Sequence, residues 1–379
     1  MRTDIRASGE NTRAAHLPTG GLPGEPGDAF AAGLAALEGH RLGEPVGGQA
    51  FASGTAAATA VFLAFAGAGA HVVAPHSASG AVRALLTGPL ARFGVQATFA
   101  DFTDPAAVGA ALRPATRLVW AETLAGPAAP ADLPALAAVA RQAGAVLAVE
   151  STWATPVVCR PLEHGADLVV HTATPYLGGH GGAVVARPAR LAEVRRVHAA
   201  TGAVLAPGQA QALRRALATL PLRVRRHCDT ASIVAAALAR HPAVASVAYP
   251  GLPGHPGHGL ARELFDAGPE GTRFGAVVVL TPRGGSEAGP ALVEALGAAD
   301  VSGGARTEAV HLASTTYRHL DAAGLAAAGV EPGAVRLAVG LEDADDLIRA
   351  LTHALDAVAR AAGQVPRSRP AEPLVADPG

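Results

Sequence analysis

The feature that most constrains the fold is a regular alternation of short apolar runs with longer helical segments over residues 46–186. The runs are apolar on both faces, which is typical of parallel strands in a sheet that helices cover on both sides. Asp104 before Pro105 is one of the helix-start signals between the runs. The predicted strands are residues 71–74, 95–99, 117–121, 145–149, 168–172 and 183–186, and the predicted helices include 29–42, 55–66, 79–93, 105–113 and 133–143.

A second α/β unit follows a long helix, predicted over residues 209–240 with an interruption at Pro221. The residues after position 365 are rich in proline, a composition typical of disorder. Strands are predicted at 243–249, 275–280 and 335–340, and helices at 286–296 and 344–362. We therefore divide the chain into an N-terminal arm with the first helix (1–44), a large α/β domain (45–240), a small C-terminal α/β domain (241–363) and a disordered tail (364–379).

Composition excludes several classes of function. Thirty Lys plus Arg against 31 Asp plus Glu leave a net charge near zero, so no basic face for nucleic acid is predicted. Cys159 and Cys228 form no disulfide framework, which fits a reducing compartment. The most apolar run, residues 56–70, is too short to span a bilayer, and the first residues lack a hydrophobic signal core. We expect a cytoplasmic protein with neither a membrane nor a nucleic-acid partner.

The chain contains no lysine, because all 30 residues counted as Lys plus Arg are arginines. A Schiff base with an aldehyde needs a primary amine that can lose its proton, whereas a guanidinium stays protonated. Replacement of Lys by Arg through base-composition drift explains the exposed positions. Any site that depended on a lysine amine has lost its reactive atom.

The segment Gly165-Ala-Asp-Leu-Val-Val-His-Thr-Ala-Thr-Pro-Tyr-Leu-Gly-Gly-His-Gly-Gly182 resembles the cofactor-anchoring segment of the Cys/Met-metabolism family of pyridoxal-phosphate (PLP) enzymes, which includes the cystathionine γ-synthases and γ-lyases. In that family it reads His-Ser-Ala-Thr-Lys-Tyr-x-Gly-Gly-His-Ser-Asp, and the lysine forms the Schiff base with PLP. Here that position is Pro175. The resemblance therefore implies the family's fold without its reactive residue.

Further stretches resemble the family in order and spacing, from about residue 25 to residue 360. The resemblance implies the type I fold of PLP-dependent transferases, similar to aspartate aminotransferase. That fold has a mostly parallel sheet with helices on both faces and a smaller C-terminal α/β domain. The matching stretches begin at Phe51 (Phe-Ala-Ser-Gly-Thr-Ala-Ala), Trp120 (Trp-Ala-Glu-Thr-Leu-Ala-Gly-Pro), Val149 (Val-Glu-Ser-Thr-Trp-Ala-Thr-Pro), Leu217, Tyr249 and Val335.

By resemblance, the turn after Phe51 would hold the cofactor phosphate at a helix N-terminus. The chain departs from the family at most other ligand-facing positions. Glu150 replaces the Asp that pairs with the ring nitrogen, and Ser79 replaces the Tyr that stacks on the ring. The other departures from the family are Gly20, Leu22, Gly126, Gly181 and Gly182. The resemblance implies no catalytic residue in this chain. It implies a vestigial cofactor-binding site formed by Ser53, Gly54, Thr55, Ser79, Glu150, Thr172 and Thr174.

Three further positions carry alternatives. Arg336 aligns with the arginine that binds the substrate carboxylate, and we favour a pairing of Arg336 with Glu150 across an emptied pocket if the two prove close. His171 is either a core histidine at a strand end or the base of an altered enzyme. His255 and His258 have a spacing compatible with a metal, but no cysteine or carboxylate cluster flanks them, so no metal site is predicted.

Two classes of function remain. The leading hypothesis is a degenerate, lysine-less homologue without Schiff-base catalysis that acts as a structural or regulatory partner subunit. It would form a homo-oligomer, or a hetero-oligomer with an intact PLP-dependent homologue. The alternative is an enzyme of sulfur amino-acid or specialised metabolism that binds PLP or pyridoxamine phosphate (PMP) noncovalently, with His171 or another histidine as base. A third possibility is a different, amino-acid-like ligand held by Arg336 and Glu150.

Overall fold

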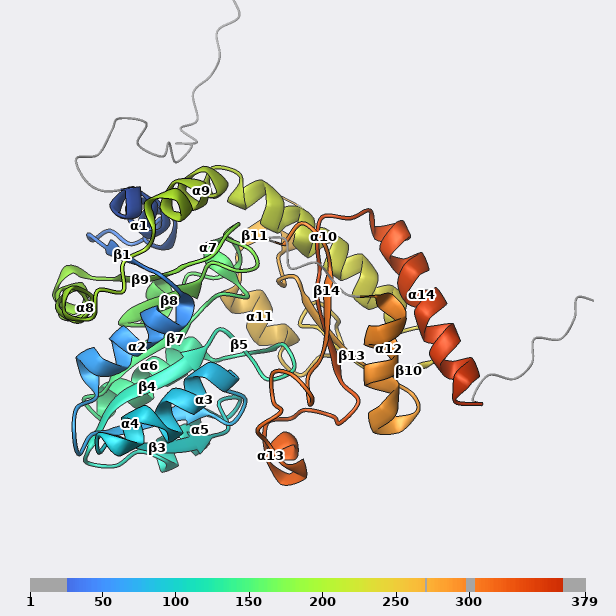
Figure 1. Cartoon of the computed structure of the whole chain (residues 1–379), viewed down its shortest axis with the longest axis horizontal. Helices are drawn as coiled ribbons and strands as arrows, with labels where there is room; N and C mark the ends of the chain where they lie inside the picture. Colours follow the sequence, from blue (N-terminus) through green and yellow to red (C-terminus); the bar gives the residue numbers. More distant parts are fainter. Residues whose placement is uncertain (1–25, 270, 298–303, 364–379) are drawn as a thin grey trace, which may run out of the picture.

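The computed structural model describes residues 26–269, 271–297 and 304–363. Most of the predicted arm, the predicted tail, and the departures at Gly20 and Leu22 lie outside the described residues. Two main sheets, on the left and right of Figure 1, are connected by the helices α9 (Pro207–Leu217) and α10 (Leu220–Leu238) along its upper edge.

The larger sheet has seven strands in the order β1-β9-β8-β7-β4-β2-β3. Five of them, β2, β3, β4, β7 and β8, are mutually parallel, whereas β9 runs antiparallel to both of its neighbours. The predicted mostly parallel sheet is confirmed. The bounds are β1 Gly47–Phe51, β2 His71–Pro75, β3 Gln96–Ala100, β4 Thr116–Glu122, β7 Val146–Glu150, β8 Leu168–Thr172 and β9 Gly182–Ala186.

Helices cover both faces of this sheet because its strands are apolar on both sides. Along β4, Leu118 and Trp120 pack into one core, and Val119 and Ala121 pack into the other. This alternation follows the two-residue period of a strand. The first core takes residues from α2 (Gly54–Phe65), α3 (Gly80–Thr87) and α8 (Pro188–Thr201), and the second from α1 (Pro26–Glu38), α6 (Leu133–Gln142), α9 and α10.

The helix predicted over residues 79–93 is broken into α3 and α4 (Pro89–Arg92). Gly88 separates the two, and its N–H still bonds the carbonyl of Ala84 at 3.0 Å. Pro89 has no N–H and cannot continue an i to i−4 ladder, but it is well suited to a first helical turn. The sequence Gly-Pro therefore starts a new helix where continuous helix was predicted.

The helix predicted over residues 209–240 is also two helices, but the interruption is not at Pro221. The break falls at Ala218 and Thr219, between α9 and α10. Pro221 lies in the first turn of α10, where its missing N–H would have had no acceptor inside the helix. The proline therefore marks the start of a helix rather than a kink within one.

The smaller sheet has four antiparallel strands in the order β10-β13-β15-β14. Helices α10, α12 and α14 pack on one face, and a second cluster, which includes Tyr317, covers the other. The bounds are β10 Val244–Ala248, α11 His258–Leu264, β13 Val277–Pro282, α12 Ala288–Leu296, β14 Glu308–His311, α13 Ala322–Ala327, β15 Val335–Ala338 and α14 Ala344–Ala361.

Several elements were not predicted. The first strand, β1, reads Gly-Gly-Gln-Ala-Phe, and its two glycines give it little strand propensity. It forms because β9 offers a free edge for pairing. Helix α8, with 14 residues, was also not predicted. The other unpredicted elements are short: β5 Leu124–Ala125, β6 Ala129–Pro130, β11 Ala267–Gly268, β12 Gly271–Thr272, β14, α7 Thr155–Val158, α13, and 3-10 turns at Pro161–His164 and Gly285–Glu287; the short α5 covers Pro105–Ala110.

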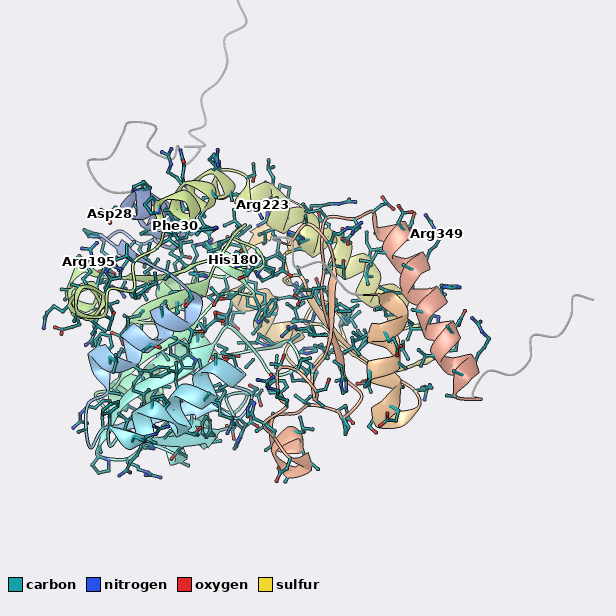
Figure 2. All side chains as sticks on the ribbon, viewed as in Figure 1. Asp28, Phe30, His180, Arg195, Arg223 and Arg349 are labelled. Atoms are coloured by element: carbon teal, nitrogen blue, oxygen red, sulfur yellow. The ribbon has the colours of Figure 1, made fainter. Side chains whose placement is uncertain are left out.

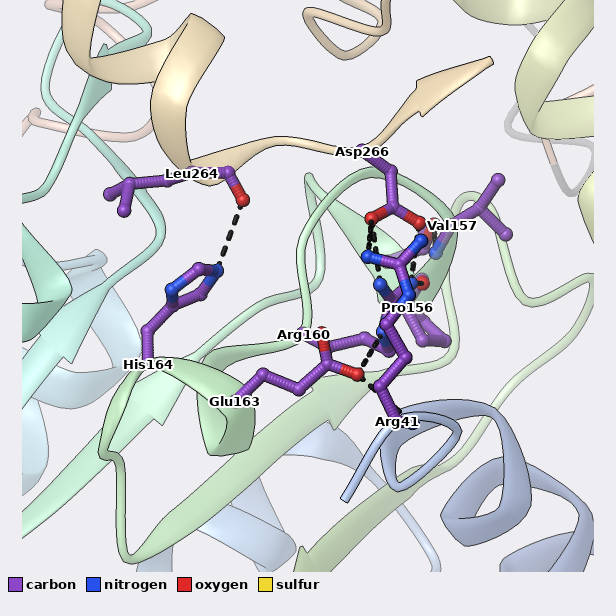
Figure 3. Close-up of polar contacts among 9 residues, drawn as sticks. Arg41, Pro156, Val157, Arg160, Glu163, His164, Leu264 and Asp266 are labelled. Atoms are coloured by element: carbon purple, nitrogen blue, oxygen red, sulfur yellow. Dashed lines mark hydrogen bonds and ion pairs between the residues drawn. The ribbon is translucent and has the colours of Figure 1, made fainter. Parts of the chain in front are cut away.

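A buried arginine joins distant parts of the chain (Figure 3). Arg160, whose side chain is 5% exposed, donates from Nη1 and Nη2 to the two carboxylate oxygens of Asp266, each at 2.6 Å. Its Nε donates to Glu163 at 2.7 Å, and Arg41 also reaches Asp266 at 3.1 Å. Bidentate pairs of this kind fix orientation as well as contributing energy. The network joins the segment that follows α11 to the segment between β7 and β8 of the larger sheet.

Candidate functional site

A cavity of about 200 Å³ lies at the carboxyl ends of β4, β7 and β8, beside α2 and α3. Ligands of parallel α/β sheets bind at this edge. Figure 1 shows these strands and helices together in the left half of the molecule. Of the predicted cofactor positions, the cavity is lined by Gly54, Thr55, Ser79, Glu150, Thr172 and Thr174; the wall also includes Trp120, Glu122, Thr152 and Trp153.

The N-terminus of α2 forms one wall. Ser53 is not on the wall itself, because its Oγ accepts the N–H of Ala56 at 3.0 Å and caps the helix. Gly54 packs so closely on Thr172 that a Cβ at position 54 would overlap the threonine hydroxyl. The first N–H groups of a helix have no intrahelical acceptor, and the dipole favours an anion there. This end of the cavity suits an anionic group.

Two glutamates on the cavity wall end neighbouring strands. Glu122 and Glu150 are direct register partners on β4 and β7. Burial, together with the charge of Glu150, raises the pKa of Glu122 to about 8, although a hydrogen bond from the Ser79 N–H at 3.2 Å and the charge of Arg336 oppose the rise. Burial likewise raises the pKa of Glu150. Glu122 is therefore mainly protonated at neutral pH.

The carboxylate of Glu150 is held by Thr152, two residues along the chain. The Thr152 hydroxyl donates to its Oε1, and the Thr152 N–H donates to its Oε2 at 3.3 Å. The same hydroxyl accepts the Thr172 N–H at 2.7 Å, so the network spans β7 and β8. The expected pairing of Glu150 with Arg336 is wrong, since no ion pair between described residues joins them. Two nearby donors satisfy this carboxylate instead.

Arg336 extends from β15 towards this region. Its Cζ lies 4.5 Å from the ring centroid of Trp153, a wall residue of the cavity. Its Nε is buried and has no partner among the described residues. Burial lowers the pKa of Arg336, while Glu308 and Tyr317 are among the groups that raise it. A planar guanidinium with free donors is suited to a carboxylate.

Pro175 and His171 do not line the cavity. Pro175 is buried, and the carbonyl of the next residue, Tyr176, accepts Nη1 of Arg223 at 2.6 Å; Figure 2 labels Arg223 on α10. His171 is fully buried, with Nε2 2.7 Å from Oε1 of Glu38. It points away from the cavity because side chains alternate along β8, where the neighbouring positions 170 and 172 face the cavity. The proposed base role for His171 is therefore wrong.

The histidine pair singled out in the sequence bonds backbone atoms. Nδ1 of His255 accepts the N–H of Gly257 at 3.1 Å, and Nδ1 of His258 lies 2.8 Å from the carbonyl oxygen of Pro250. Within residues 26–269, 271–297 and 304–363, no group of three or more His, Cys, Asp or Glu side chains could hold a metal ion. In the same residues, no helix combines the length and apolar character that a membrane crossing requires.

Glu122, Trp120 and Thr152 line the cavity but were not among the predicted cofactor positions. A signal was available for the first two. Trp120 lies in the strand predicted over residues 117–121 and Glu122 follows it directly, so the two share a face, and Glu150 directly follows the strand predicted over residues 145–149. The role of Thr152 depends on the rotation of the Glu150 side chain, which no local pattern specifies.

The fit of PLP, the cofactor that the resemblance implies, differs between the two ends of the cavity. The α2 N-terminus fits a phosphate, since Gly54 and Thr55, its first two residues, line the cavity. The other end does not fit a cofactor bound through a Schiff base. No amine is present there, Pro175 lies off the wall, and two acidic groups share the space.

Comparisons with known proteins agree with this geometry. The sequence pattern of the family described as Cys/Met metabolism PLP-dependent enzymes matches residues 27–356. The chain is 39% identical over 326 residues to the L-methionine gamma-lyase of Porphyromonas gingivalis, covering 82% of this chain and 80% of that protein. It is 38% identical over 336 residues to the cystathionine gamma-synthase of Mycobacterium tuberculosis, covering 86% and 83%.

A solved structure of cystathionine gamma synthase from Xanthomonas oryzae pv. oryzae, in complex with aminoacrylate and cysteine, superposes with a TM-score of 0.81. The sequence identity in that comparison is 33%, and the superposition covers 90% of this chain and 87% of the other. The type I fold is thus confirmed. On the strength of the matched family pattern and of these relatives, the chain belongs to the Cys/Met-metabolism family of PLP-dependent enzymes.

Proposed function

We propose that this protein is a lysine-less member of its family that performs no Schiff-base catalysis. The observation that carries the proposal is the absence of lysine from all 379 residues, with Pro175 at the position of the family's lysine. Arginine cannot replace it, because a guanidinium remains protonated and is not a nucleophile towards an aldehyde. Drift from Lys to Arg accounts for exposed positions, but an enzyme that depended on the amine would have kept that one.

We further propose that the chain is a structural or regulatory subunit in the cytoplasm. It would act in a homo-oligomer, or in a hetero-oligomer with an intact PLP-dependent homologue. Support comes from the packing, since apolar clusters fill both faces of both main sheets although the reactive amine is gone. Agreement between pattern, packing and caps is typical of a sequence that specifies one structure.

One observation favours a second candidate, noncovalent binding of PLP or PMP. The first residues of α2 line the cavity and suit a phosphate. Without an amine at position 175, such binding would leave the protein free of any covalent adduct. A catalytic base for this candidate would have to be a residue other than His171, which is fully buried on the opposite face of β8.

Covalent attachment is tested by adding PLP to the purified protein, reducing with borohydride and measuring the intact mass. We expect no pyridoxyl group on an internal residue, and no keto acid released from methionine or cystathionine. A stoichiometric internal adduct, or turnover comparable to that of a lysine-bearing family member, would contradict the proposal. An absorbance change without an adduct would support the second candidate.

The subunit role is tested separately by sedimentation. The protein is measured alone and mixed with an intact, lysine-bearing homologue from the same organism. We expect an oligomer of one kind or the other. A stable, folded monomer in both measurements would contradict the subunit role while leaving the first proposal in place.

A further inference from the structure

A second, larger cavity lies between the two domains, and we call it the interdomain cavity. Its volume is about 1010 Å³, and among the described residues it shares no wall residue with the cavity beside α2. The large domain contributes the residues that directly follow β2 and β3. The small domain contributes the end of β10, the loop before α11 and the end of α13. A volume of this size is at the upper end of the range for small-molecule sites, about 300–1,000 Å³.

The wall of the interdomain cavity is mainly apolar. Phe102, Ala125 and Ala328 on this wall are buried, whereas Asp101 and Thr103 are exposed. The cavity therefore extends from an apolar base to a polar mouth, which suits a ligand with an apolar body and a polar head. The wall residues are Ala, Gly, Pro, Val, Leu and Phe, apart from His76, Ser77, Asp101, Thr103 and His255.

Among the described residues, Asp101 is the only charged one on this wall. Its Oδ1 accepts the N–H and the hydroxyl of Thr103, at 2.8 and 2.7 Å, and these two bonds orient the carboxylate. Its Oδ2 accepts no hydrogen bond from a described residue, and Asp101 takes part in none of the ion pairs between them. A free carboxylate beside an apolar wall attracts a cationic group and repels an anionic one.

The two histidines of the wall do not offset this charge. Burial and the charge of Arg83 lower the pKa of His76, although the charge of Asp101 opposes the shift, so the ring is neutral at neutral pH. In His255, Nδ1 accepts a backbone N–H at 3.1 Å, and burial lowers the pKa. Arg83 lies off the wall, because its Nη2 donates to the carbonyl oxygen of His76 at 2.8 Å and its guanidinium stacks on Phe99. On the described wall, a ligand therefore meets one negative charge and no positive charge.

We propose that the interdomain cavity binds an apolar molecule that carries one amine, with its ammonium group at Asp101 and its apolar body between the two domains. The neutral ring of His76 offers the ammonium a second acceptor, and it lies near enough to Asp101 for the carboxylate to affect its pKa. The proposal is independent of the lysine-less function, because it uses only residues outside the wall of the cavity beside α2.

Isothermal titration of the full-length protein with matched probes tests the preference for an ammonium group. Naphthylethylamine, naphthylethanol and naphthylpropionate share an apolar body and carry an ammonium, a hydroxyl and a carboxylate; ethylamine carries the ammonium without the body. We expect naphthylethylamine to bind at least about fivefold more tightly than each of the other three, because only it combines the apolar body with a charge-assisted hydrogen bond. If it does not bind up to its solubility limit, or if another probe comes within about fivefold of it, the proposal is wrong.

A variant of Asp101 then locates the ammonium group. Asp101→Asn should weaken naphthylethylamine at least about fivefold and leave naphthylethanol unchanged, because the amide oxygen can still accept from Thr103 while the charge is lost. Asp104→Asn, on an exposed aspartate outside the wall, is the matched control. Asparagine caps α5 as well as aspartate does, so this variant should bind like the wild type. Amine binding that survives Asp101→Asn would refute the position of the ammonium group.

Two further variants locate the apolar body. Ala248→Trp puts an indole on the wall and should weaken naphthylethylamine and naphthylethanol at least about tenfold, with urea unfolding as the check that the variant is folded. Glu150→Gln alters only the cavity beside α2 and should leave both probes unchanged. Loss of binding in Glu150→Gln, or full binding in folded Ala248→Trp, would place the probe elsewhere and overturn the proposal. If Ala248→Trp does not fold, Asp101→Asn and Glu150→Gln decide the question.

Discussion

Replacing Glu122 by Gln should stabilise the protein, and the gain should grow with pH. Burial and the neighbouring Glu150 raise the pKa of Glu122 from 4.5 to about 8. A raised carboxyl pKa means that the folded protein binds this proton more tightly than the unfolded chain. The wild type therefore loses stability as the pH rises from 4.5 towards 8. Glutamine stays neutral, and its carbonyl can still accept the N–H of Ser79 that now reaches Glu122.

The magnitude follows from the linkage between pKa and stability. At about 1.36 kcal/mol per pKa unit, the difference between 4.5 and about 8 corresponds to at most about 5 kcal/mol above pH 8. The same relation gives a gain for Glu122→Gln that grows by about 3 kcal/mol between about pH 5.5 and about pH 8.5. An effect of this size is a large part of the stability of an ordinary domain.

The assay is urea unfolding of the wild type, Glu122→Gln and the exposed control Glu331→Gln over that pH range. The difference between the first two should increase with pH, whereas the control should follow the wild type. A difference that does not change with pH would show that Glu122 ionises with an ordinary pKa. Burial and the charge of Glu150 would then not raise the pKa of Glu122.

Two further substitutions test the site and the fold. Pro175→Lys alone should restore no lyase or synthase activity in a keto-acid assay with added PLP. The reason is that, by resemblance, Ser79 replaces the Tyr that stacks on the ring and Glu150 replaces the Asp that pairs with the ring nitrogen. Turnover like that of a family enzyme would show that these two substitutions do not prevent catalysis. Arg160→Ala should lower the free energy of unfolding by about 3–5 kcal/mol, because it leaves the carboxylate of Asp266 without its bidentate partner. A loss below about 1 kcal/mol in urea unfolding would show that the network is exposed to solvent.

The sequence by itself determined the large domain. Runs that are apolar on both faces can be stable only between two layers of helices, so a mostly parallel sheet was predictable, and β2, β3, β4, β7 and β8 are parallel. The absence of lysine, on which the proposed function rests, is also a property of composition and needs only a count of residues. Six of the seven predicted cofactor positions line one cavity, since each lies near the end of a strand or the start of a helix.

Only the tertiary structure decided the partners of individual side chains. His171 faces Glu38 because α1 covers that face of β8, and the strand pattern cannot say which helix lies where. Glu150 bonds Thr152 rather than Arg336 because a donor two residues away needs no long side chain to be ordered against it. Local sequence determines the spacing of apolar residues and the helix caps. Strand register, side-chain rotation and burial depend on elements that are distant in the chain and meet only in the folded protein.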